Sequence, residues 1–284
     1  MSSKTKALLA IIGAAVFGGG NIIYSKIGLR EIPPFSFMFL RFLLASLLIL
    51  PFYLKSPLPF RRLWLPALVS LFSSANIFLF AFGIRLTTAT VSQIIYSFVP
   101  IITTILAHYL IKEKLTPRKI FGVGLGFFGL INILGTPQRL AGNLLLLIGA
   151  TFLSFYPVLS KKIQVKYSPW KLTTIFIFTT TVVGGLFSLT ELSLLSTWSA
   201  TVSILAWFSL IFVAIFGTIV YYWLTQEAIK HGSAVIGSMI LYLQPVTTYF
   251  WAYFILSEQL SWTILVGGLL TIAGAYLTTT AKKT

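Results

Sequence analysis

The chain has 284 residues, of which 57% are hydrophobic and only 9% are charged, with a formal net charge of +16 and no cysteine. Even a large soluble core leaves a polar or mixed surface, so this composition excludes a soluble globular protein and predicts one solvated by lipid. The lack of cysteine excludes disulfides and thiolate metal sites. The positive charge does not predict a nucleic-acid partner, because the basic residues are scattered in short links between apolar segments.

The apolar segments have the length of transmembrane helices. A helix needs about 20 apolar residues to cross a hydrocarbon core of ~30 Å. Ten segments meet this criterion, near residues 7–28, 34–54, 63–83, 87–110, 117–135, 142–163, 169–190, 200–224, 231–256 and 261–280. The first follows two lysines, as in a signal peptide, but it aligns with an internal segment, so we expect it to be retained. The expected fold class is an all-α integral membrane protein with ten transmembrane helices.

The chain contains an internal repeat. Residues 87–133 align without a gap to residues 232–278 at an offset of 145, and a shorter match further upstream has an offset of 136. Matched pairs include Pro100 and Pro245, Glu113 and Glu258, Gly122 and Gly267, Gly129 and Gly274, and Gly13 and Gly149. A proline, a rare acid and several glycines in fixed register are unexpected by chance in so apolar a chain. We therefore predict two five-helix repeats, residues 1–140 and 141–284.

The distribution of Lys and Arg predicts the orientation. Links on the side of the amino terminus hold 16 of these residues, and links on the opposite side hold four. By the positive-inside rule, both termini are expected in the cytoplasm and the protein in the cell membrane. Because each repeat has an odd number of helices, the second enters the membrane from the other side. Inverted repeats are the architecture of secondary transporters, in which either half can open the centre of the protein.

Two local patterns carry a family resemblance. An Arg-Phe-Leu-Leu-Ala string occupies Arg41–Ala45 in the second segment, and each half has a mid-helix proline followed by a glutamate and glycines. With ten segments in two halves, the chain resembles EamA-type transporters of the drug/metabolite transporter superfamily over essentially its whole length. It departs from the family at Gly18–Asn21, where a Trp-Gly string is common. The resemblance implies export of a small metabolite, often an amino acid.

Helix-disrupting residues occur at matching positions of the two halves. Gly20 and Asn21 match Tyr156 and Pro157, and Pro100 matches Pro245. Backbone groups freed by an interruption can face a substrate near the middle of the membrane, so Pro100, Pro157 and Pro245 are predicted to be helix-break or gating positions. The alternative is that these residues only kink the helices to allow packing.

Polar side chains at the same depth predict a substrate cavity, because amides and hydroxyls that face lipid are costly. The predicted substrate-binding residues are Gly20, Asn21, Tyr24, Ser73, Asn76, Gln93, Tyr96, Ser97, Tyr156, Thr218, Tyr221, Ser238, Tyr242 and Gln244. Any single hydroxyl can instead bond to its own helix, so the prediction depends on the cluster. Tyrosines, amides and hydroxyls with few charges favour a small neutral or zwitterionic substrate, and a bulky apolar amino acid is the best single choice.

Three charged residues are predicted to have structural roles. Arg41 lies about seven residues, or ~10 Å, into the second segment, shallow enough for its side chain to snorkel or pair. Contact with the substrate is the alternative for this residue. Glu113 and Glu258 precede helices, where a carboxylate suits the positive end of the helix dipole. Proton coupling is the alternative for these two acids.

Two other classes of function fit the sequence less well. A membrane enzyme would need a metal cluster or paired acids, but the chain has two histidines and no acid deep in an apolar segment. An ion channel would need a symmetric filter of charges or carbonyls, which the inverted repeat does not suggest. We therefore expect a transporter without catalytic residues, metal or cofactor, whose partners are a small-molecule substrate and the lipid bilayer. The oligomeric state, monomer or homodimer, is left open.

Overall fold

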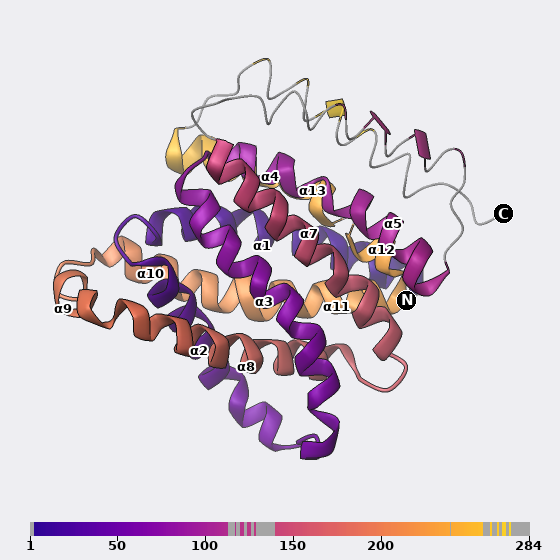
Figure 1. Ribbon diagram of the computed structural model, residues 1–284, viewed down its shortest axis with the longest axis horizontal. Coiled ribbons are helices and arrows are strands. Elements are labelled where there is room, and N and C mark those ends of the chain that lie inside the picture. The colour runs from indigo at the N-terminus through magenta and orange to yellow at the C-terminus, as the bar shows by residue number, and fades with distance from the viewer. Residues whose placement is uncertain are drawn as a thin grey trace.

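The computed structural model describes residues 3–112, 140–238 and 240–257, with isolated positions between 117 and 128 and between 262 and 273. All regular elements of this part are helical, and they lie side by side in an elongated bundle (Figure 1). Seven of the described helices are long and apolar enough to cross a membrane. The predicted fifth and tenth segments, and with them Glu113 and Glu258, fall largely outside the described residues. The described part is thus all-α, and its long apolar helices are those of a multi-pass membrane protein.

The described part of the first half contains three long helices and one divided helix. Their bounds are Ser3–Gly28 for α1, Pro34–Leu54 for α2, Trp64–Arg85 for α3, Ala89–Tyr96 for α4 and Val99–Ile111 for α5, with a 3-10 turn, η1, at Phe60–Arg62. The predicted fourth segment is interrupted between α4 and α5, directly before Pro100. A proline in the first turn of α5 costs no hydrogen bond, because the N–H groups there have no partner within the helix.

The second half has a corresponding series of helices. Their bounds are Leu140–Ile163 for α7, Pro169–Ser188 for α8, Leu189–Leu194 for η3, Leu195–Trp198 for α9, Ile204–Ala214 for α10, Ile215–Val220 for η4, Tyr221–His231 for α11, Ala234–Ser238 for α12 and Ile240–Leu256 for α13. The element η4 is a π-helix that joins α10 and α11 into one long crossing. Hydrophobic patterning did not predict it, because a π-turn leaves the apolar character of a segment unchanged.

The prolines differ in their effect on the backbone. Helix α7 continues through Pro157, and α13 continues through Pro245. Gly20 and Asn21 likewise lie inside the continuous helix α1. Transmembrane helices tolerate such residues because neighbouring groups satisfy the freed backbone atoms. The expected interruption at matching positions of both halves therefore does not occur at these sites, and among the three prolines only Pro100 adjoins one.

The repeat is also visible in the backbone geometry. Lys112 has φ 57° and Ser257 has φ 52°, and they are the non-glycine residues with positive φ in the described part. Lys112 follows the end of α5, and Ser257 follows the end of α13, at the offset of 145 found in the sequence. A left-handed residue after the last turn ends both helices. The two halves thus have matching helix ends as well as matching residues.

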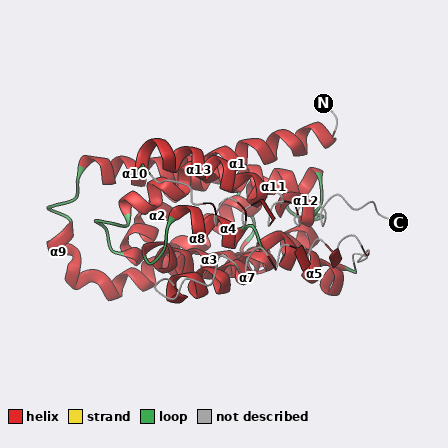
Figure 2. Ribbon diagram, turned by 90° about the horizontal axis from the view of Figure 1, so that it is seen from above, coloured by secondary structure: helices red, strands yellow, loops and turns green. Residues whose placement is uncertain are grey.

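The two halves interlock. Helix α1 packs against α13 and against the α10–α11 crossing, while the repeat-related helix α7 packs against α4, α5 and α3. Helices α2 and α8, which also correspond to each other, pack together. Figure 2 shows α1 and α10 along one face of the bundle and α3 and α7 along the other. Each major contact between the halves therefore has a counterpart between the corresponding helices.

Two carboxylates connect the halves at the end opposite the described amino terminus. Glu31 of the first half accepts hydrogen bonds from Ser203 N at 2.6 Å and Ser203 Oγ at 2.8 Å, at the start of α10. Glu191 of the second half accepts from Phe35 N at 3.2 Å and Ser36 N at 2.7 Å, at the start of α2. Both acids satisfy N–H groups at a positive helix end. We call these two contacts the glutamate latches.

Candidate functional site

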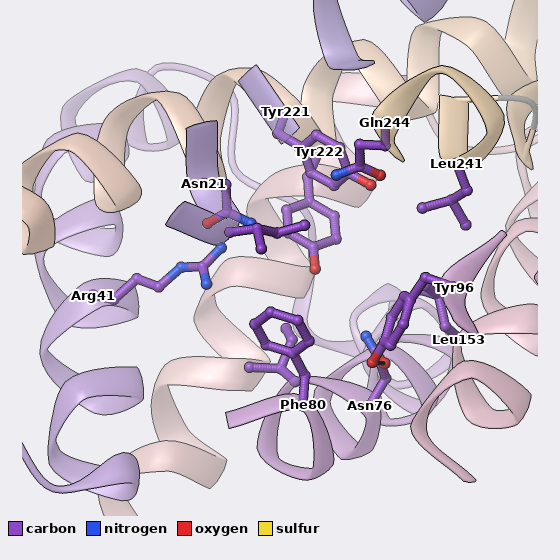
Figure 3. A pocket seen from close by; sticks show the side chains of 12 residues that line it. Asn21, Arg41, Asn76, Phe80, Tyr96, Leu153, Tyr221, Tyr222, Leu241 and Gln244 are labelled. Carbon is purple, nitrogen blue, oxygen red and sulfur yellow. Dashed lines mark hydrogen bonds between the residues drawn. The ribbon is translucent and has the colours of Figure 1, made fainter. Parts of the chain in front are cut away.

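A cavity of about 50 Å³ lies where the two halves meet, and we call it the central cavity (Figure 3). Seven of its lining residues come from the first half and five from the second, namely Asn21, Ile22, Arg41, Asn76, Ile77, Phe80 and Tyr96, and Leu153, Tyr221, Tyr222, Leu241 and Gln244. Ligand pockets usually measure about 300–1,000 Å³, so this space is small for a metabolite. It must enlarge before it can hold a metabolite.

Arg41 joins the halves beside this cavity. Its side chain is only 2% exposed, Nε donates to Thr218 Oγ1 at 2.6 Å, and Nη2 donates to Gly217 O at 2.9 Å. Its guanidinium carbon also lies 5.1 Å from the centre of the Phe42 ring. Of the two outcomes expected for Arg41, snorkelling and pairing, the side chain pairs, because the π-helix offers it a hydroxyl and a carbonyl inside the protein. It is a buried cation that faces the central cavity.

The π-helix explains how Arg41 reaches a backbone carbonyl. Thr218 Oγ1 donates to Val213 O at 2.8 Å, five residues earlier, in the widened turn. Gly217 has no side chain to cover its own backbone, and a Cβ there would collide with the side chain of Asn21. Helix α1 can therefore approach η4 closely, which brings Asn21 next to Arg41 in the cavity wall (Figure 3).

A buried pair forms the opposite wall. The hydroxyl of Tyr96 on α4 donates to Asn76 Oδ1 on α3, and both side chains are at least 95% buried. Gly149 on α7 leaves the space for this pair, since a Cβ there would lie 3.1 Å from the tyrosine oxygen and 3.2 Å from the asparagine oxygen. This wall thus consists of side chains from α3 and α4 of the first half, which α7 of the second half approaches closely at Gly149.

Gln244 supplies an unpaired acceptor. Its side chain is 3% exposed, and its Oε1 has no hydrogen-bond partner. The side chain packs against Gly18 of α1, where a Cβ would collide with it. Nearby, Thr247 Oγ1 donates to Ala15 O at 2.7 Å and holds α13 to α1. A buried oxygen without a partner is costly, so a ligand donor at this position would be favoured.

A second cavity of about 30 Å³ adjoins the first on the side of the amino terminus. Tyr156, Pro157 and Ser238 line it, together with four side chains that also line the central cavity, which are Leu153, Tyr221, Tyr222 and Leu241. We call these four the partition. Because these four side chains line both spaces, their movement would join the cavities.

The predicted site residues divide into five groups. Asn21, Asn76, Tyr96, Tyr221 and Gln244 line the central cavity, and Tyr156, Pro157 and Ser238 line the second cavity. Ser73, Ser97, Thr218 and Pro100 are buried beside the cavities, with Ser97 Oγ donating to Leu241 O at 3.2 Å. Gly20, Tyr24 and Pro245 line neither cavity. The side chains of Gln93 and Tyr242 lie outside the described residues.

The displaced and missed residues have a common explanation. Tyr24 packs among aromatic rings instead of facing a cavity, with centroid distances of 4.3 Å to Phe212 and 6.2 Å to Trp251, and Gly20 lies against the same two side chains. Tyr222 was not predicted although it lines both cavities beside Tyr221. The repeat alignment named only Tyr221, because it assumed regular α-helical spacing. Apolar lining residues such as Phe80 and Leu153 carry no polar signal in the sequence.

Comparison with known proteins follows the same two-part division. Residues 5–135 and 140–280 each match the family model described as the EamA-like transporter family. A protein of Archaeoglobus fulgidus named as an uncharacterized transporter is 30% identical over 98% of this chain and 98% of its own length. The uncharacterized transporter YetK of Bacillus subtilis is 26% identical over 98% of this chain and 88% of its own length. A solved crystal structure that is 16% identical shares the fold, with a TM-score of 0.70 over 97% of this chain and 96% of that one.

Proposed function

Because the chain belongs to the EamA-like transporter family, we propose that it moves a small neutral or zwitterionic metabolite across the cell membrane by alternating access. An amino acid with a bulky apolar side chain is the best single candidate. The observation that carries this proposal is the central cavity between the halves, to which both halves contribute polar side chains. A site at such an interface can stay in place while the halves rock around it.

The internal symmetry supports this mechanism. The corresponding helix pairs and the left-handed ends of α5 and α13 agree with two related halves. We propose that residues 1–140 and 141–284 are inverted copies related by an axis in the membrane plane, and that both termini are cytoplasmic. In an inverted pair, one half can adopt the conformation of the other, and the cavity then opens to the opposite side.

The chemistry of the cavity supports the substrate class. Its polar groups are a guanidinium, three amides and three tyrosines, beside apolar side chains such as Phe80 and Leu153. A phosphorylated or polyanionic substrate would need several Lys or Arg at this depth, because a desolvated phosphate requires several charge-assisted hydrogen bonds. Among the described residues that line the cavity, Arg41 is the only Lys or Arg. Aromatic and aliphatic walls suit an apolar side chain.

Counterflow in liposomes tests the proposal. Purified protein is reconstituted, the liposomes are loaded with an unlabelled compound, and uptake of the same labelled compound is followed. We expect saturable counterflow with apolar amino acids such as L-leucine or L-phenylalanine, and none in protein-free liposomes. Counterflow of a sugar phosphate or nucleotide, without a response to any amino acid, would contradict the substrate class. Non-saturating ion conductance without counterflow would instead indicate a channel.

A further inference from the structure

Building on the proposed transport of an amino acid, we propose that Arg41 binds the substrate's carboxylate and that Gln244 Oε1 accepts a hydrogen bond from its ammonium group. The two side chains belong to different halves, on α2 and α13, and both line the central cavity (Figure 3). The cavity then recognises both charged ends of one small molecule. Molecules with only one of these two charged ends are selected against.

Arg41 has donor capacity beyond its present partners. Nε and Nη2 are bound to oxygens, whereas the contact recorded for Nη1 is Met38 Sδ at 3.9 Å, and a thioether is a weak acceptor. Figure 3 shows the guanidinium extended toward Asn21 and the middle of the cavity. A carboxylate that enters here meets a planar donor already fixed in orientation. Such charge-assisted hydrogen bonds are among the strongest in proteins.

The acids of the described part are engaged elsewhere. Glu31 binds Ser203, and Glu191 binds the start of α2. Glu227 Oε2 lies 3.3 Å from His231 Nε2. None of them lies in the wall of the central cavity, so within the described residues Arg41 brings a buried positive charge without a carboxylate partner. A buried charge of this kind is costly until an opposite charge approaches. An anionic ligand group at Arg41 relieves that cost, whereas a cationic one increases it.

Gln244 provides the group that recognises the ammonium end of the substrate. Its unpaired Oε1 can only accept, so it favours the ammonium group over the carboxylate. Gly18 permits the close packing of α1 that holds this side chain in place. The carboxylate therefore lies toward α2 and the ammonium toward α13, which fixes the orientation of the molecule. A substrate bound in this way bridges the two halves.

Competition with wild-type protein gives the first test. Counterflow of labelled L-leucine is measured against unlabelled L-leucine, leucinamide, which lacks the carboxylate, and 4-methylpentanoate, which lacks the ammonium group. A lost hydrogen bond to a charged group corresponds to about a 10- to 100-fold loss of affinity, so we expect both analogues to compete more weakly by about this factor. Leucinamide that competes as well as leucine would overturn the assignment of Arg41.

Variants test the carboxylate contact of Arg41 and the ammonium contact of Gln244 separately. With Arg41→Gln we expect affinity for leucine to fall by about 10- to 100-fold and the discrimination against leucinamide to disappear. With Gln244→Leu we expect the discrimination against 4-methylpentanoate to disappear, while that against leucinamide persists. Arg61→Gln removes an exposed charge from the η1 link and serves as the matched control, with unchanged affinities. An Arg41 with only a structural role would leave the ratios between competitors unchanged, which would refute the proposal.

Failure of the inference and failure of the proposed function give different results. If Arg41→Gln does not fold, Arg41→Lys keeps the charge but loses the planar donor, and we expect weaker leucine binding with discrimination against leucinamide retained. Counterflow of leucine that leucinamide inhibits equally well overturns the inference and leaves the transport proposal intact. The absence of counterflow with any amino acid overturns both.

Discussion

Tyr96 and Asn76 illustrate how one hydroxyl organises the wall of the central cavity. Tyr96→Phe removes the donor to Asn76 Oδ1 and leaves that buried oxygen without it. We expect a loss of about 1–3 kcal/mol in the free energy of unfolding, which a thermal unfolding scan of the purified protein would measure as a lower Tm. Tyr109→Phe is the control, because that side chain is 74% exposed. Equal shifts in both variants would contradict the role of the pair.

At the same scale, polarity was the property that the sequence could report. Asn21, Asn76 and Gln244 were predicted because amides that face lipid are costly, and they line the central cavity. Tyr24 was predicted for the same reason, but its ring packs among other aromatic rings. A tyrosine can end in a cavity or in an aromatic cluster, and only packing decides between them. The apolar lining residues could not be predicted, since every helix is rich in them.

At the scale of elements, Gly217 tests the importance of the π-helix. Gly217→Ala places a methyl group against Asn21, and overpacking of this kind costs about 1–3 kcal/mol. We expect a lower Tm and reduced counterflow. Gly124→Ala is the matched control, because a Cβ there meets nothing within 4 Å, and alanine favours a helix over glycine by about 0.5–1 kcal/mol. A Gly217→Ala protein that behaves like the control would show that the close approach of α1 is dispensable.

Pro100 tests the interrupted fourth helix. Pro100→Ala relieves the backbone constraint beside the turn between α4 and α5 without leaving a polar side chain buried, so we expect counterflow to fall by a larger factor than the yield of folded protein. Pro245→Ala should have a smaller effect on counterflow, because α13 continues through that position. Size-exclusion chromatography measures the folded yield beside the flux assay. A parallel loss of folding and transport would favour a role in packing alone.

The helices themselves were largely predictable, and their irregularities were not. Hydrophobic length located α1, α2, α3, α7 and α8 to within a few residues. The π-helix η4 depends on hydrogen-bond register, which hydropathy does not encode. The continuous course of α7 through Pro157 depends on compensation by neighbouring groups. Local disruptors therefore indicated where irregular backbone could occur, but packing determined where it did.

At the scale of the whole molecule, the two ends of the bundle differ. The glutamate latches join the halves at one end, and the second cavity lies toward the other, behind the partition. The central cavity of about 50 Å³ is small for a metabolite in this arrangement. On the alternating-access proposal, we expect the latches and the partition to release in turn during transport. The latches bind helix ends of the opposite half, so their release is coupled to relative motion of the halves.

A reversible cross-link across one latch tests this motion most directly. The chain has no cysteine, so a Glu31→Cys and Ser203→Cys pair introduces the only thiols. Glu31 Oε1 lies 2.8 Å from Ser203 Oγ, and cysteine is shorter than glutamate, so a short bis-methanethiosulfonate reagent is used to span the two thiols. The two single-cysteine variants control for loss of the latch itself. We expect L-leucine counterflow to stop when the reagent links the two thiols and to return when reduction releases it. Fully cross-linked protein that transports as fast as the same protein with free thiols would contradict alternating access between the halves.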